Sequence, residues 1–246
     1  STEVSRKRRL YAKDPVASQI KSGVDFLINL SASPFERGKS HKRLKLLAAQ
    51  ALKARRPFLY CNLVGGNDEL IFDGNSLALD ARGRAIARAK AFNEDLILID
   101  TESRAAEKLL PEMEYIEEIH EALVLGIRDY VGKCGFSKVF IGLSGGIDSA
   151  LVCALAVKAL GAKSVTGVSM PSPYSSQGSV TDARALAANL GVRLLTLPIT
   201  EIYQSTLKNL KAAFTGKPED SSEQNIQARI RGTLLMALAN KERALL

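Results

Sequence analysis

The sequence predicts an α/β protein with two parts, the second built on a doubly wound parallel sheet. Short apolar runs at 139–143, 164–170 and 193–197 alternate with longer segments of helical periodicity, which is typical of parallel strands connected by helices. The charged stretch 101–114 lacks strand periodicity and separates this alternation from an earlier group of strands and helices. The sequence therefore predicts two domains and a linker, with bounds at 1–100, 101–114 and 115–246.

Bulk composition narrows the class of protein. The chain has 246 residues, of which 46% are hydrophobic and 24% charged, so it can bury a proper core. No apolar run approaches the roughly 18 residues that a membrane span needs, and no signal peptide opens the chain. Cys61, Cys134 and Cys153 show no metal or redox spacing. We therefore expect a reduced, cytoplasmic setting and no membrane partner.

The net charge of +8 is concentrated in two basic segments, Arg6–Arg9 and Arg37–Arg56. Clusters of this kind also occur in nucleic-acid-binding proteins. We interpret them instead as a solvated basic face, or one that attracts nucleotide phosphates, and expect no nucleic-acid partner.

In the first part, residues 1–13 are polar and basic, and we expect a loop there. Asp14 and Pro15 have the residue types of a helix N-cap and first helical position, and that helix should end near Gly23. A second helix is predicted for 40–55, stopped by Pro57. Its apolar face comprises Leu44, Leu47, Ala48, Ala51 and Leu52, and we expect Lys42, Arg43, Lys45 and Lys53 to face outward.

Strands separate and follow these helices. The apolar, β-branched or aromatic runs that predict them are 24–30, 58–64, 69–79 and 95–100. We expect turns at 31–35 and 65–68, and a hairpin at 80–83 that returns the chain into 84–92. Cys61 falls inside an apolar strand, where we expect a small buried hydrophobic side chain rather than a nucleophile.

The second part begins with a predicted helix, 115–133. Its apolar stripe comprises Ile116, Ile119, Leu123, Ile127 and Val131, and His120 lies at the edge of that stripe, where a catalytic role is not expected. The buried strand 139–143 follows, then Ser-Gly-Gly-Ile-Asp-Ser at 144–149, then a helix that Gly161 ends.

The segment 144–149 thus lies where a strand turns into a helix. Its two glycines let backbone N–H groups approach an anion, the helix start adds free donors, and Ser144 and Ser149 add hydroxyls. Asp148 would repel a phosphate unless a magnesium ion lay between them. No lysine is present, so the segment is not a Walker A loop.

This motif resembles the signature of the PP-loop ATP pyrophosphatases, Ser-Gly-Gly-x-Asp-Ser. The resemblance implies that the loop grips the β,γ-pyrophosphate of ATP, which is cleaved between the α and β phosphates, with Mg²⁺ at Asp148. The ATP-binding residues that it implies are Gly142, Leu143, Ser144, Gly145, Gly146, Ile147, Asp148 and Ser149.

Beyond this loop we expect a strand at 164–170, a helix at 177–190 ended by Gly191, and a strand at 193–197. Ligands of such sheets lie at the carboxyl ends of the strands, where the loop 170–176 also falls. A last helix should run from Ser221 or Ser222 to about Asn240.

Two longer segments of the first part, Asn29–Lys39 and Tyr60–Ser76, resemble the glutaminase domain of glutamine-dependent NAD synthetases, a branch of the nitrilase superfamily. This implies the C-terminal part of a nitrilase-like α/β sandwich, followed by the PP-loop domain. It also implies that Ser33 and Lys39 bind glutamine; otherwise they are a turn-capping serine and a solvated lysine.

The sequence departs from that family at one point. In the family, the Glu, Lys and Cys of the glutaminase triad precede the segment that corresponds to Asn29–Lys39. The first cysteine of this chain is Cys61, which follows that segment. We therefore assign no catalytic triad residue and expect this chain to begin downstream of the triad and not to hydrolyse glutamine. Because a further strand should begin near Leu246, we expect a fragment cut at both ends.

Residues Glu223–Gly232 also resemble a sequence segment of NAD synthetases, which implies that Asn225, Arg229 and Arg231 bind deamido-NAD. The resemblance implies ATP-dependent amidation of deamido-NAD to NAD through an adenylated intermediate, with glutamine or ammonia as nitrogen source, in a homo-oligomer when full length. Two alternatives stay open: another PP-loop ligase, such as a GMP synthetase or a tRNA-modifying enzyme, and a catalytically inactive nucleotide-binding fragment.

Overall fold

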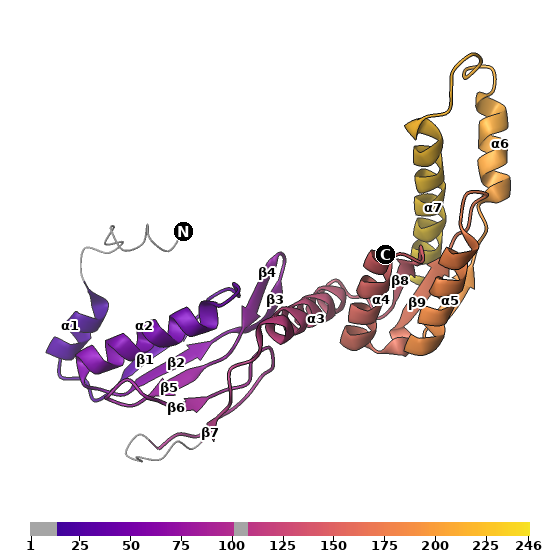
Figure 1. Cartoon of the computed structure of the whole chain (residues 1–246). Helices are drawn as coiled ribbons and strands as arrows, with labels where there is room; N and C mark the ends of the chain where they lie inside the picture. The colour runs from indigo at the N-terminus through magenta and orange to yellow at the C-terminus, as the bar shows by residue number, and fades with distance from the viewer. Residues whose placement is uncertain (1–13, 101–107) are drawn as a thin grey trace. The chain divides into compact units, whose positions relative to one another are not determined.

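The computed structural model describes residues 14–100 and 108–246 (Figure 1). The predicted polar start and the first half of the predicted linker, 101–107, lie outside these residues. The chain divides into two compact units, Ser1–Ala122 and Leu123–Leu246, and helix α3 (Tyr115–Lys133) crosses the division. The domain bounds inferred from sequence stay a prediction. In the described ranges no helix has both the length and the apolar character that crossing a membrane requires.

The first unit contains a mixed sheet with the strand order β1-β2-β5-β6-β7. Strands β1 and β2 are parallel, β2, β5 and β6 are successively antiparallel, and β6 and β7 are parallel. Strands β3 and β4 form a separate antiparallel pair. The elements are α1 (Pro15–Lys21), β1 (Leu27–Ser31), α2 (Lys39–Ala54), β2 (Phe58–Asn62), β3 (Val64–Asn67), β4 (Leu70–Asp73), β5 (Leu77–Leu79), β6 (Ala85–Arg88) and β7 (Lys108–Leu109).

Helix α2 lies across one face of this sheet (Figure 1). Leu47 and Ala51 of α2 pack against a buried cluster that includes Leu27, Phe58 and Leu79. The predicted cap of the first helix is confirmed, because the Asp14 carboxylate accepts a hydrogen bond from Ala17 N at 3.2 Å. The hairpin predicted at 80–83 is confirmed as the connection between β5 and β6.

Three predictions for the first unit are wrong. Arg43, expected to face outward, is buried because it pairs with Asp73, whereas Leu52 is 59% exposed. The segment expected to turn at 65–68 is mostly strand β3, paired with β4 along its length. Cys61 is exposed, since its neighbours Tyr60 and Asn62 occupy the buried face of β2.

The strand predicted at 95–100 is also wrong in part. The segment alternates as a strand should, with Leu96 and Leu98 exposed and Ile97 and Ile99 packed on the sheet face formed by Ala78, Ile86 and Ala87. It joins no sheet as a strand. The apolar run therefore predicted an extended segment that packs on the sheet, but not that it lacks a paired strand.

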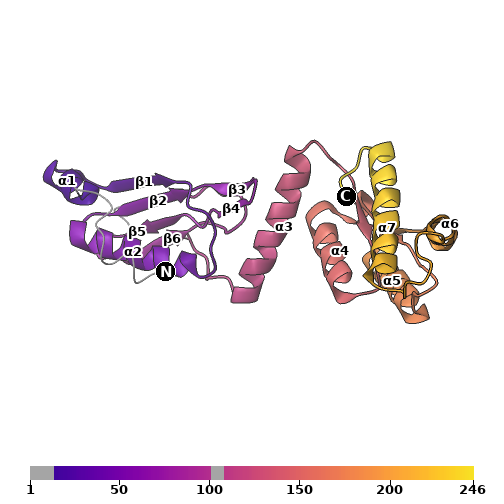
Figure 2. The same cartoon turned by 90° about the horizontal axis from the view of Figure 1, so that it is seen from above.

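The second unit confirms the doubly wound parallel sheet, with the order β10-β9-β8 and all pairs parallel. Figure 2 shows its helices around this sheet. The elements are β8 (Val139–Gly142), α4 (Ile147–Leu160), β9 (Val165–Ser169), α5 (Gln177–Leu190), β10 (Arg193–Thr196), α6 (Thr200–Leu210) and α7 (Ser221–Glu242). The predicted bounds of α3 and α5 match those observed.

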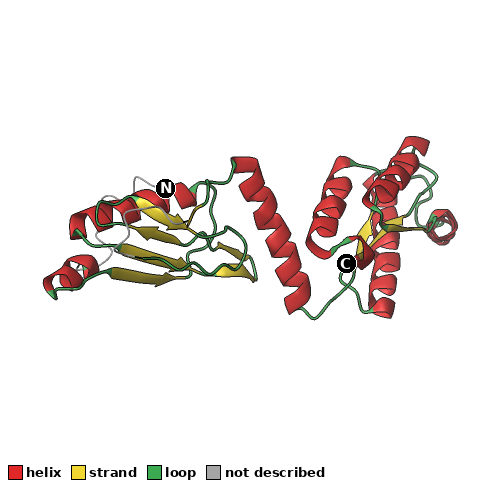
Figure 3. Ribbon diagram, turned by 90° about the horizontal axis from the view of Figure 1, so that it is seen from below, coloured by secondary structure: helices red, strands yellow, loops and turns green. Residues whose placement is uncertain are grey.

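Helices cover both faces of the sheet (Figure 3). On one face, α4 and α5 pack with the end of α3 against Val139 and Val165. On the other face, α7 packs against Phe140 and Val168. The chain returns to the sheet at Leu245, whose backbone bonds with Lys138 and Phe140 at 3.0 and 2.9 Å. A strand was predicted to begin near this point, and the bridge lies beside β8.

Details of three helices differ from expectation. In α3 the predicted stripe includes Ile116 and Leu123, which are exposed, because the buried face is shifted toward Ala122 and Leu125. Helix α7 is capped by Asp220 rather than by a serine, with Glu223 completing a capping box. Helix α6 was not predicted at all.

Candidate functional site

The loop between β8 and α4 folds into a compact turn held by its two serines. Ser149 Oγ donates to Gly146 O at 2.9 Å and lies 3.1 Å from Ser144 Oγ. Ser144 N donates to Ser149 Oγ at 3.3 Å, and Gly146 N donates to Ser144 Oγ at 3.2 Å. Two hydroxyls spaced five residues apart therefore shape a loop whose sequence leaves few other side chains to do so.

Gly145 is the position where only glycine fits. Its φ is +83°, and a Cβ there would lie 2.3 Å from the backbone oxygen of Ser179 in α5. The loop thus passes against the start of α5 with no room for a side chain. Gly146 then caps α4 in an extended conformation, with no side-chain hydrogen bond to the cap, so the first N–H groups of α4 stay available to an anion.

A pocket of about 330 Å³ opens beside this loop. Three of the eight residues predicted to bind ATP line it, namely Gly142, Leu143 and Ser144. The remaining lining residues are Ser169, Met170, Pro171, Ser175, Ser179, Val180, Arg231 and Leu235. Met170, Pro171 and Ser175 belong to the loop 170–176, which the sequence placed at the ligand-binding ends of the strands, whereas Ser179 of α5 was not singled out.

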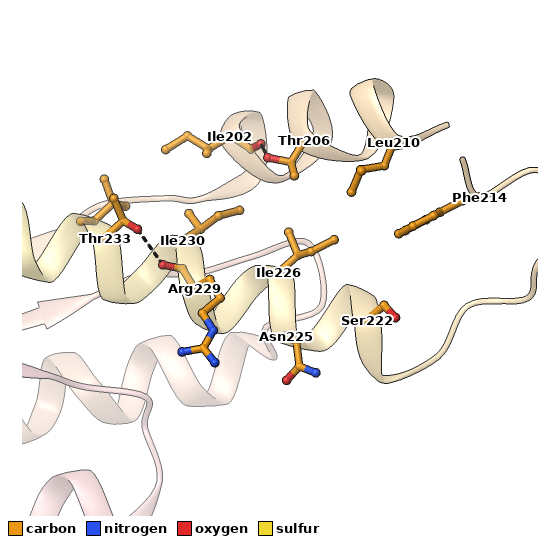
Figure 4. Close-up of a pocket in the computed structure, with 11 residues that line it drawn as sticks. Ile202, Thr206, Leu210, Phe214, Ser222, Asn225, Ile226, Arg229, Ile230 and Thr233 are labelled. Carbon is orange, nitrogen blue, oxygen red and sulfur yellow. Dashed lines mark hydrogen bonds between the residues drawn. The ribbon is translucent and has the colours of Figure 1, made fainter. Parts of the chain in front are cut away.

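The structure separates the three residues predicted to bind deamido-NAD. Asn225 and Arg229 line a groove of about 610 Å³ between α6 and α7, whereas Arg231 lines the pocket beside the loop. In Figure 4, Ile226 and Ile230 point toward α6, while Asn225 and Arg229 project away from it. The Arg231 Nε donates to Met170 O at 3.1 Å, which ties α7 to the end of β9. Arg231 thus shares a site with the loop residues.

A second polar pocket adjoins Arg231, lined by two tyrosines and several carboxylates and amides. Tyr174 and Tyr203 meet edge to face with ring centroids 6.0 Å apart. Burial, then the Tyr174 hydroxyl, raises the pKa of Tyr203 to about 12. Its phenol is therefore neutral at physiological pH, and its buried hydroxyl has no hydrogen-bond partner among the described residues.

Asp148 lies in the first turn of α4 and is exposed. Among residues 14–100 and 108–246, no group of three or more His, Cys, Asp or Glu side chains is placed to hold a metal ion. Mg²⁺ needs only one or two carboxylates when phosphate oxygens and waters complete its shell. A lone carboxylate at this position therefore fits Mg²⁺ that arrives with a phosphate ligand, but not a metal held by protein alone.

The two residues predicted to bind glutamine lie close together in the first unit. Lys39, the first residue of α2, donates from Nζ to Pro34 O at 2.8 Å. Ser33 precedes that proline, and its N–H donates to Asn62 Oδ1 at 2.9 Å. The hydroxyl of Ser33 forms no hydrogen bond with another residue of the described ranges, so it is free to meet a ligand.

Comparison with known proteins covers both units. The family model for NAD synthase matches residues 119–246. A glutamine-dependent NAD(+) synthetase of Synechocystis sp. is 48% identical over 240 residues, 95% of this chain and 43% of that protein. The corresponding synthetase of Thermotoga maritima is 41% identical over 265 residues, with 93% of this chain and 46% of that protein covered. The chain spans less than half the length of these relatives.

Two solved structures that resemble this chain are also glutamine-dependent NAD+ synthetases. The glutamine-dependent NAD+ synthetase of Acinetobacter baumannii, determined in complex with ADP, has a TM-score of 0.87 at 41% identity over 92% of this chain and 44% of that one. The enzyme of Cytophaga hutchinsonii, at 24% identity and a TM-score of 0.79 over 92% of this chain and 45% of that one, shares the fold. The family model covers more than half of this chain, and the chain belongs to the NAD synthase family.

Proposed function

We propose that the second unit binds ATP at the 142–149 loop and that the whole protein amidates deamido-NAD to NAD. The observation that carries this proposal is the serine-shaped loop, with Gly145 closed against Ser179 and the free N-terminus of α4 beyond it. Family membership and the ADP bound to the A. baumannii relative support it.

The chemistry needs an activated acid. A carboxylate is a poor electrophile, so the nicotinate carboxylate of deamido-NAD first attacks the α-phosphorus of ATP. The bond between the α and β phosphates breaks, and pyrophosphate leaves. Ammonia then attacks the adenylated carbonyl carbon and AMP departs, giving NAD. Charge builds on the departing pyrophosphate, where the N–H groups of α4 and the hydroxyl of Ser144 stabilise it, while Ser149 Oγ donates to Gly146 O and holds the loop in shape.

Asp148 is the residue that would hold Mg²⁺ against the phosphates, and bound Mg²⁺ would neutralise charge on the leaving pyrophosphate. We assign Arg231 to the same neighbourhood, as a guanidinium that faces the phosphate-binding loop. Asn225 and Arg229 remain the candidates for deamido-NAD, on a separate part of α7.

The first unit supplies the nitrogen in this proposal. The Lys39 ammonium and the Ser33 hydroxyl are donors suited to the polar groups of glutamine. Ammonia must arrive unprotonated to be a nucleophile, which favours delivery within the protein over uptake from water at neutral pH. We place the activity in the cytoplasm and in a homo-oligomer. The free thiols of Cys61, Cys134 and Cys153 support the first of these proposals.

The relatives argue against a different PP-loop ligase, because their similarity extends across both units. A nucleotide-binding protein without turnover is the other alternative. Incubating the whole protein with ATP, deamido-NAD and ammonium distinguishes them. Formation of NAD is expected, whereas ATP binding without NAD formation would favour the non-catalytic alternative.

Replacing Asp148 with alanine is expected to abolish magnesium-dependent ATP binding, because no Asp or Glu among the described residues lines the pocket beside the loop. Isothermal titration calorimetry with ATP, with and without Mg²⁺, measures this. Glu201→Ala is the matched control, since Glu201 is also an exposed carboxylate in the first turn of a helix. Unchanged MgATP affinity in Asp148→Ala would contradict the role of Asp148. Tight Mg²⁺ binding without ATP would contradict the single-carboxylate site.

A further inference from the structure

A buried polar network lies in the first unit on the strands next to Ser33. Asp73 is 2% exposed and Arg43 is 7% exposed. The guanidinium Nη1 and Nη2 donate to the two carboxylate oxygens of Asp73 at 3.0 and 2.9 Å, and Asn62 Nδ2 donates to Asp73 Oδ1 at 3.2 Å. Burying three polar side chains is costly unless they satisfy one another, as these largely do.

The network ends on the backbone of Ser33. Asn62 Oδ1 accepts from Ser33 N at 2.9 Å, and Asn62 Nδ2 lies 3.4 Å from Ser33 O as a weaker second contact. The carboxylate of Asp73 can only accept, so the amide must turn its NH₂ toward Asp73. Its oxygen then faces the N–H of Ser33. Asp73 therefore fixes which atom of Asn62 meets Ser33.

Arg43 connects the same network to Lys39. Both residues belong to α2, with Arg43 one turn after Lys39 on the same side of the helix. Strand β4, which carries Asp73, also holds the chain between the two ligand candidates, because Phe35 N donates to Ile71 O at 2.6 Å. Segment 33–39 is thus held at both ends and in the middle by one set of contacts.

We infer that Asn62, oriented by Asp73 and Arg43, is a positioning residue that sets the Ser33 hydroxyl at a fixed place relative to the Lys39 ammonium for glutamine. This inference rests on the proposed function of the first unit. Asn62 need not touch the substrate. It removes the rotational freedom of the Ser33 peptide before glutamine binds, so that binding does not have to order the loop.

The test uses the whole protein with Asn62 replaced by alanine, and by serine as a milder variant. The KM for glutamine in glutamate release is expected to rise about tenfold, the worth of one well-placed hydrogen bond. NAD formation from ammonium is expected to stay within about twofold, because that step belongs to the other unit.

Leu79→Ala separates positioning from simple loss of stability. Leu79 is fully buried in the core, and its partner in β2 is Phe58, at the far end of that strand from Asn62. This variant should lower the melting temperature at least as much as Asn62→Ala while leaving the KM for glutamine unchanged. A KM that rises equally in both variants would overturn the inference, as would an unchanged KM in Asn62→Ala.

Failure of the proposed function has a different signature. If the whole protein without substitutions releases no glutamate from glutamine, the assignment of Ser33 and Lys39 to glutamine is wrong, and so is the inference. If the unaltered protein hydrolyses glutamine but makes no NAD from ammonium, the synthetase proposal alone fails. The glutamine KM of Asn62→Ala still decides the inference in that case.

Discussion

Arg43 shows how one partner decides where a charged side chain lies. Its position in α2 among lysines indicates an exposed face, yet it is buried with both terminal nitrogens on Asp73. The guanidinium carbon also lies 5.4 Å from the centre of the Tyr60 ring, within range of a cation–π contact. A buried ion pair is stable only as a pair, because each charge alone would be stranded away from water.

Asp73→Ala is therefore expected to destabilise the first unit by about 3–5 kcal/mol, since Arg43 would remain buried without its partner. Urea denaturation followed by circular dichroism measures this. The double variant Arg43→Met with Asp73→Leu should be more stable than Asp73→Ala, because no charge is then stranded. If the double variant has a lower free energy of unfolding than Asp73→Ala, the loss of stability in Asp73→Ala does not come from a stranded Arg43 charge, and the expectation is wrong.

At the scale of elements, the β8-loop-α4 unit depends on a contact from a different element. Gly145 adopts a positive φ, and the space that a side chain would need is occupied by Ser179 of α5. Loop shape is thus set jointly by the two serines within the motif and by the packing of the next helix. This explains why Ser144 and Ser179 line one pocket although 35 residues separate them.

Gly145→Ala is expected to weaken MgATP binding by at least about tenfold and to lower the melting temperature, because the loop or α5 must move to admit the methyl group. Gly191→Ala is the matched control. Gly191 also has a positive φ, 67°, but a Cβ there would meet nothing within 4 Å. It should cost about 1 kcal/mol of stability and leave MgATP affinity unchanged. Equal affinities in both variants would contradict the role of the close approach.

At the scale of the whole molecule, the first unit presents an apolar sheet face opposite α2. Ile28 and Leu30 of β1 are 55% and 80% exposed, and the exposed Cys61 lies beside them on β2. Ile97 and Ile99 cover part of this face, over Ala78 and Ala87, and a pocket of about 210 Å³ between segment 95–100 and the sheet is also lined by Ile28 and Cys61. Exposed apolar surface of this kind is typical of a site that contacts other apolar surface.

We expect the chain 1–246 to bind the dye ANS and to self-associate through this face. Replacing Ile28 and Leu30 together with lysine should reduce both, as measured by fluorescence and sedimentation velocity. Leu52→Lys is the control, because Leu52 is similarly exposed on α2, away from the sheet face. Dye binding and association that persist in the double variant would show that another surface is responsible.

Much of the fold was predictable because local chemistry sufficed. Asp14 with Pro15, Gly161 and Gly191 mark helix ends by their own backbone preferences. The alternation of apolar runs and helical segments is enough to predict the parallel sheet, since its central strand β9 is buried along most of its length. The candidate nucleotide site could also be located from sequence, because the Ser-Gly-Gly-Ile-Asp-Ser motif lies in six consecutive residues between a strand and a helix.

The features that the sequence did not predict depend on contacts with residues distant in the chain. The apolar run 95–100 predicts a strand but does not show whether another strand pairs with it. The position of Arg43 among lysines likewise predicts an exposed side chain until Asp73 is seen beside it. The resemblance grouped Arg231 with Asn225 and Arg229 as ligands of deamido-NAD, although α7 directs Arg231 to a different pocket. By itself the sequence determined most of the helices, the parallel strands and the loop that resembles an ATP site, because short-range sterics and capping act within a few residues. Only the tertiary structure decided which polar groups meet, because their burial depends on side chains contributed by other elements.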